Sequence, residues 1–139
     1  MAYFWVHIGP MKHIWLVGLL FLFIGTTAAA QADIFNPMRD AIKAGNAKEL
    51  AKHFNQSVDL NLEGNTSIYS KTQAEIVIRD FFQKHPKSDF AIVHTGSSKG
   101  GLQFAIGRFV SGGQNYSVLM RVRQVGEVFL IHEISFVKE

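Results

Sequence analysis

The sequence predicts an α+β domain in which a curved antiparallel sheet packs on two N-terminal helices. Three patterns lead to this fold class: two capped segments with apolar residues at helical spacing, one alternating segment between them, and four β-rich segments separated by glycines. With 139 residues, of which 47% are hydrophobic, the chain has room for a single core.

Residues 1–32 are predicted to be a cleavable signal peptide. Residues 14–25 are uncharged and apolar, but this run is shorter than the roughly 20 residues that a membrane-spanning helix needs. Ala28, Ala30 and Ala32 then give two overlapping A-x-A cleavage patterns, and Lys12 makes Met11 the expected start. We therefore predict a periplasmic or secreted domain of residues 33–139 with no membrane span after cleavage. An uncleaved anchor or a buried helix is the alternative.

The amino-acid composition excludes disulfide bonds as a source of stability and argues against nucleic acid as a partner. The chain has no cysteine, which excludes a disulfide scaffold and a lipid-modified cysteine. Without Lys12, thirteen of the fourteen Lys and Arg residues remain against eleven Asp and Glu, a net charge of +2. These charges are scattered, so we expect no nucleic acid partner.

The helical signals come first in the mature chain. Asn36 and Pro37 predict a helix start, and Gly45 predicts a break. Asn46 is then predicted to be a second N-cap, with Glu49 three residues further along the chain as its reciprocal partner. The second helix is capped by Ser70 or Thr72, stopped by Pro86, and carries Ala74, Val77, Ile78, Phe81 and Phe82 on one face.

The strand signals are alternation and β-branched or aromatic content. Val58, Leu60 and Leu62 alternate with polar residues and predict one strand, ended by Gly64 and Asn65. Four further strands are predicted over 90–95, 102–110, 116–125 and 128–137, with glycines at the turns. Four consecutive strands with short connections predict an antiparallel meander.

These elements resemble the nuclear transport factor 2-like superfamily over nearly all of the mature chain, residues 34–138. The resemblance is carried by the segments Ile34–Phe54, Ser70–Ala74 leading to Phe81 and Phe82, and Val128–Ile134. More narrowly, the chain resembles a domain of unknown function found in short exported Bacteroidetes proteins. The resemblance implies a cystatin-like cone in which a cavity between sheet and helices, or the open sheet face, carries the function.

Members of this superfamily include isomerases, dehydratases and many binding domains, so the fold does not decide the function. Its isomerases use a carboxylic base with a tyrosine and an acid in the cavity, and that set has no match here. The interpretation therefore favours a non-catalytic module that binds a small apolar ligand or a partner protein. A small-molecule isomerase- or dehydratase-like enzyme and a structural or self-associating envelope protein, which includes a homodimer, are the alternatives.

Five residues are candidates for ligand binding. Alternation places Arg121 with Ser117, Leu119 and Arg123 on one face of its strand, opposite Tyr116. His132 interrupts the row Val128, Leu130, Ile134 and Phe136, and His94 follows Phe90 and Ile92 in the same way. A histidine in an apolar row can anchor a ligand or move a proton, although it is more often a hydrogen-bonded core residue. Tyr69 and Tyr116 have hydroxyls that could contact a ligand.

The sequence gives no motif for a cofactor or a metal. His85, His94 and His132 lack metal-ligand spacing, so no metal is expected. Without a cysteine or a G-x-S-x-G segment, no nucleophile is assigned, and Gly100 and Gly101 lack the context of a phosphate loop. We assign no catalytic residue and expect no cofactor.

Overall fold

The structure is a computed structural model that describes residues 27–86 and 88–139, with side chains from Ile34 onward. Most of the predicted signal peptide lies outside these residues, so its cleavage stays a prediction. Residues 32–139 form one compact unit. Its elements, in chain order, are α2 (Thr27–Ala44), α3 (Ala47–Ala51), β1 (Phe54–Leu62), β2 (Asn65–Ser70), α4 (Lys71–Lys84), β3 (Asp89–Ser98), η2 (Lys99–Gly101), β4 (Leu102–Ser111), β5 (Gln114–Val125) and β6 (Val128–Lys138).

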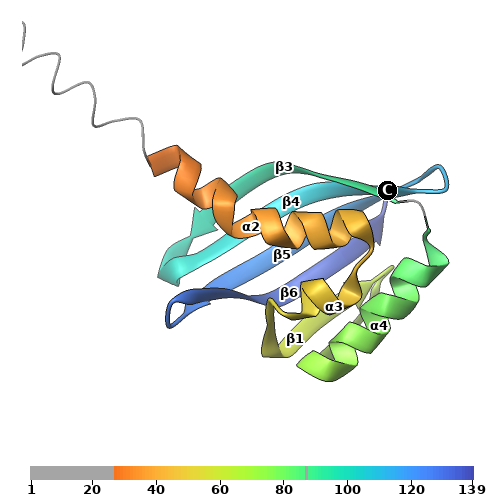
Figure 1. Cartoon of the computed structure of the whole chain (residues 1–139), viewed down its shortest axis with the longest axis horizontal. Helices are drawn as coiled ribbons and strands as arrows, with labels where there is room; N and C mark the ends of the chain where they lie inside the picture. Colours follow the sequence, from red (N-terminus) through yellow and green to blue (C-terminus); the bar gives the residue numbers. More distant parts are fainter. Residues whose placement is uncertain (1–26, 87) are drawn as a thin grey trace, which may run out of the picture. The chain divides into compact units, whose positions relative to one another are not determined.

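The strands form one six-stranded sheet in the order β2-β1-β6-β5-β4-β3. All neighbours are antiparallel except β1 and β6, which run parallel. The helices cover one face of this sheet, and the strands β3 to β6 curve beneath them (Figure 1). This arrangement confirms the predicted α+β fold class.

The helix breaks and caps follow local chemistry. Gly45 separates α2 from α3 with a φ of 66°, a left-handed conformation that favours glycine. Asn46 caps α3 by accepting a hydrogen bond from the Glu49 amide, and Ser70 caps α4 by accepting one from the Gln73 amide. The predicted start at Asn36 is wrong, because α2 begins at Thr27 and contains Pro37. The alanine-rich segment before Asn36 favours helix and extends it.

The hairpin strand β2 was not predicted. Its sequence, Asn65–Ser70, lacks an apolar alternation because almost every residue in it is exposed at the sheet edge. It pairs with β1 through Ser57–Ser70 to Leu62–Asn65. The turn between them places Glu63 at a φ of 54°, and the Glu63 amide donates to the Phe136 carbonyl at 2.9 Å.

The space between helices and sheet is filled by large side chains. Phe54, Phe109, Phe136 and Tyr116 are at most 2% exposed, and Phe35, Met38 and Ile42 of α2 belong to the same core cluster. Ring centroids of Phe81 and Phe136 lie 4.8 Å apart, where α4 meets β6. The inner face of the sheet is therefore a packed core in the described part of the chain.

Two β-bulges change the predicted strand faces. The β5–β6 register jumps from Arg121–Glu133 to Val122–Ile131, which leaves His132 as the extra residue. Ile131 is therefore buried together with Ile134, and the prediction that His132 shares a face with Ile134 and Phe136 is wrong.

The second bulge lies in β3. The β3–β4 register jumps between Ile92 and His94, which leaves Val93 as the extra residue. His94 is exposed and pairs with Ile106, so it does not share the inner face with Phe90. In both strands one inserted residue reverses the alternation beyond it.

Candidate functional site

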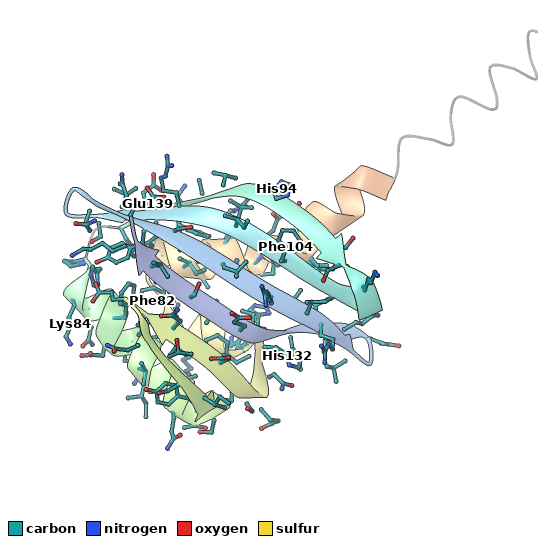
Figure 2. The ribbon with its side chains drawn as sticks, turned by 180° about the vertical axis from the view of Figure 1, so that it is seen from behind. Phe82, Lys84, His94, Phe104, His132 and Glu139 are labelled. Carbon is teal, nitrogen blue, oxygen red and sulfur yellow. The ribbon has the colours of Figure 1, made fainter. Side chains whose placement is uncertain are left out.

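A groove of about 460 Å³ lies on the outer face of the sheet, which we define as the side of β3 to β6 turned away from the helices. Phe104 lies opposite Arg121 and Ile106 opposite Leu119 in the β4–β5 register. Figure 2 shows this face in front, with Phe104 on β4. The groove is lined by Ser98, Leu102, Phe104, Ile106, Leu119 and Arg121. Its floor is apolar and its rim is polar.

One end of the groove is basic. Arg121 forms an ion pair with Glu133 at 3.1 Å. Arg123 lies opposite Leu102 in the β4–β5 register, and Lys99 follows Ser98 directly. Neither Lys99 nor Arg123 forms an ion pair within the described residues. Lys99 and Arg123 therefore flank this end of the groove as two cations without a carboxylate partner among the described residues.

Two of the candidate histidines lie on the same face (Figure 2). The His94 ring lies 5.8 Å from the Phe104 ring, beside the groove. His132 lies at the bulge of β6, and no group within residues 27–86 and 88–139 forms a hydrogen bond with its enclosed Nε2 atom. Burial, and to a lesser extent the Arg123 charge, lower the pKa of His132. This shift favours the neutral imidazole at pH 7.

The candidate tyrosines lie elsewhere. Tyr69, on β2, lines a smaller pocket of about 180 Å³ between the β1–β2 hairpin and α4. Tyr116 is buried on the inner face, at 2% exposure. The structure therefore brings His94, Arg121 and His132 to one face and separates Tyr69 and Tyr116 from them.

Tyr116 belongs to a polar network that sequence reasoning missed. Its hydroxyl donates to Oε1 of Glu63 at 2.8 Å and contacts Nε2 of His85 at 2.8 Å. Burial, with a contribution from the Glu63 hydrogen bond, raises the pKa of Tyr116 to about 12. From the sequence, His85 is a candidate only as a metal ligand and Glu63 has no assigned role, because the β1–β2 turn, the end of α4 and the start of β5 bring these three residues together from distant parts of the chain.

The described residues contain no group of three or more His, Asp or Glu side chains that could hold a metal ion. His85 lies at the end of α4, whereas His94 and His132 lie on β3 and β6. Among the described helices, none is both long and apolar enough to cross a membrane.

The groove floor was also missed, although the sequence contains a signal for it. Leu102, Phe104 and Ile106 alternate with Ala105 and Gly107, so β4 carries apolar residues on both faces. In a strand with one face exposed to solvent, apolar residues alternate with polar residues instead. Its outer apolar row could have been identified from that departure.

Solved structures of DUF4783 family proteins resemble this chain throughout the domain. The protein from Bacteroides uniformis is 30% identical, with a TM-score of 0.69, over 74% of this chain and 94% of its own. The protein from Bacteroides ovatus is 27% identical, with a TM-score of 0.70, over 75% of this chain and 94% of its own. No curated protein matches the chain.

A more distant structure shares the fold alone. The nuclear transport factor 2-like protein of unknown function from Shewanella baltica is 11% identical, with a TM-score of 0.62, over 81% of this chain and 93% of its own. The family described as "Domain of unknown function (DUF4783)" matches residues 35–137. The chain therefore belongs to the DUF4783 family, and its fold is that of nuclear transport factor 2-like proteins.

Proposed function

We propose that this domain is a non-catalytic binding module whose outer sheet groove receives a small amphipathic molecule with an apolar body and a negatively charged end. The observation that carries the proposal is a groove of about 460 Å³ with an apolar floor, flanked at one end by the cations Lys99 and Arg123. This volume lies in the range of about 300–1,000 Å³ that is typical of small-molecule sites.

The apolar part of the ligand lies over Phe104, Ile106 and Leu119, which are half-buried in the domain by itself. Covering them removes apolar surface from water, at about 25 cal/mol for each Å². The acidic end lies beside Lys99 and Arg123. Because the packed inner face leaves little room between helices and sheet, the outer groove supports binding better than the interior does.

A pair of fluorescent probes tests both halves of the site. 8-Anilino-1-naphthalenesulfonate has an apolar body and a sulfonate, and N-phenyl-1-naphthylamine has the same rings without the charge. We expect the sulfonate to bind more tightly. Ile106→Asp should abolish binding of both probes, because it places a carboxylate in the groove floor. Titration of each probe, with fluorescence as the readout, gives the dissociation constants.

Charge reversal separates the basic end from the floor. Arg123→Glu should weaken sulfonate binding by about 3- to 10-fold, as expected for a solvated charge pair turned repulsive, and should leave the neutral amine unchanged. Lys48→Glu, which makes the same charge change on α3, is the matched control. Because the sulfonate also binds loosened proteins, near-ultraviolet circular dichroism must match across the variants. Equal binding to wild type and Ile106→Asp would contradict the proposal. A dimer in sedimentation that Ile106→Asp dissociates would also contradict it, because a second copy would then cover the groove.

Export is a separate part of the proposal, supported by the leader sequence. Expression in a bacterium with two membranes should place the protein in the periplasm with an N-terminus at Gln31 or Asp33, as read by N-terminal sequencing. Ala30 belongs to both A-x-A patterns, so Ala30→Arg should block both cleavages and retain the leader. Ala44→Arg is the matched control. An unprocessed wild-type chain would contradict the prediction.

A further inference from the structure

The end of α4, the β1–β2 turn and the start of β5 meet in three hydrogen-bonded contacts, which we call the Glu63–Tyr116–His85 network. His85 Nδ1 lies 2.7 Å from the Phe81 carbonyl, and His85 Nε2 lies 2.8 Å from the Tyr116 hydroxyl. The hydroxyl in turn lies 2.8 Å from Oε1 of Glu63. The His85 side chain is 17% exposed and that of Glu63 is 47% exposed.

Counting protons shows that neutral His85 and ionised Glu63 cannot complete all three contacts. The Phe81 carbonyl only accepts, so Nδ1 of His85 must carry a hydrogen. The Tyr116 hydroxyl has one hydrogen. If it donates to Glu63, Nε2 of His85 must donate to the hydroxyl and the imidazole is doubly protonated. If it donates to Nε2, Glu63 must be protonated in order to donate to the hydroxyl.

We infer that the Glu63–Tyr116–His85 network stabilises the fold in a proton-dependent way. When all three contacts are made, the network holds one proton more than a neutral histidine, a neutral tyrosine and an ionised carboxylate hold together. When that proton leaves, two acceptor atoms face each other across one of the short contacts. An unsatisfied polar contact of this kind destabilises the folded state, and here it lies beside buried Tyr116.

The position of His85 supports the bound proton. The amide of His85 donates to Phe82, so the Phe81 carbonyl at the C-terminal end of α4 depends on the His85 ring for a donor. The partial negative charge at a helix C-terminus favours a cationic imidazole. Glu63 contributes in the same direction, since its Oε1 lies 3.9 Å from Nε2.

The other charges near this end are exposed and mostly paired with one another. Lys84 pairs with Asp80 at 3.0 Å, and Arg108 pairs with Glu139 at 3.6 Å. Lys43 of α2 lies 4.0 Å from Asp89 of β3. Lys138 of β6 lies opposite Tyr116 in the register. Glu63 is the carboxylate that contacts the network directly.

The extra proton determines the direction in which folding stability changes with pH. An unfolded histidine loses its proton near pH 6.5. Completing all three contacts in the folded state requires one proton that the unfolded chain no longer binds above that pH. The folded state then binds more protons than the unfolded state, so stability falls as the pH rises from about 6.5 until the network releases its proton. During that interval the ratio of folded to unfolded protein falls by up to about tenfold per pH unit, the limit for one proton.

Urea unfolding of the full chain at pH 6 to 9 tests the inference, with Glu63→Gln as the decisive variant. The glutamine amide can donate to the Tyr116 hydroxyl, which can then donate to neutral His85, so the network is complete without the extra proton. We expect the wild type to lose stability with rising pH relative to Glu63→Gln. Glu127→Gln makes the same chemical change in the exposed turn between β5 and β6, where Glu127 forms no ion pair within the described residues, and should follow the wild type.

Titration of His53 and His132 is common to the wild type and these variants, so the difference between the curves isolates the network. Parallel curves for wild type and Glu63→Gln would overturn the inference. A ¹⁵N spectrum of the His85 ring is an independent readout. A neutral ring with its hydrogen on Nε2 at pH 7 would overturn it as well, because Nδ1 could not then donate to Phe81.

Discussion

Replacing Phe109 with alanine is expected to destabilise the domain by about 3–5 kcal/mol, the range for truncation of a fully buried phenylalanine. Phe109 is 0% exposed and lies at the centre of the aromatic core. Its ring centroid lies 5.5 Å from that of Phe136 and 5.9 Å from that of Phe81, so the ring joins α4 to the sheet. Removing it leaves a cavity that rigid neighbours on two layers cannot close.

Phe104→Ala is the matched control, because Phe104 lies on the same strand and faces outward. It should cost about 1 kcal/mol or less, since its ring is already partly in water. Urea unfolding gives both values, and equal m-values would show that the same surface is exposed. Similar losses for the two variants would mean that the inner face is not the core of the domain.

Gly107→Ala is expected to destabilise the domain by about 2–3 kcal/mol through overpacking. An added Cβ would lie 2.5 Å from the Phe90 ring and 2.8 Å from the Ala91 carbonyl oxygen. Phe90 is 3% exposed, so its ring has no free direction in which to move, and the carbonyl belongs to the neighbouring strand. Relieving these two close contacts therefore requires β3 to shift away from β4.

Gly96→Ala separates this effect from a general intolerance of larger residues. At Gly96 an added Cβ would lie 2.6 Å from the Phe104 ring, with no backbone atom among its nearest contacts. Phe104 can rotate on the outer face, so the loss should be about 1 kcal/mol or less. A larger loss at Gly96 than at Gly107 in thermal or urea unfolding would contradict this account.

The local elements could be predicted because their signals are local. Gly45, Asn46 and Ser70 act through the conformation or side chain of a single residue, and each has the predicted role in the structure. The faces of β5 follow the predicted alternation, with Tyr116 inside and Arg121 outside. Periodicity is sufficient where a strand runs without interruption.

The bulges could not be predicted because their cause is not local. His132 and Val93 are extra residues only with respect to the strands that pair with them, and the register of those strands is set by packing. His94, which follows the bulge of β3, and His132, the bulged residue of β6, therefore lie on the outer face and not on the predicted inner face. The Glu63–Tyr116–His85 network was hidden for a related reason, since Glu63 and Tyr116 are 53 positions apart.

The place of β6 in the sheet has a consequence for synthesis of the protein. The last strand of the chain lies between β1 and β5, so the hairpin of β1 and β2 has no neighbour in the main sheet until β6 is present. Such distant pairing raises the contact order and slows folding. On the ribosome, the sheet cannot be completed while residues 128–138 are still in the exit tunnel. For the export proposed above, such a delay would keep the chain unfolded while it crosses a membrane.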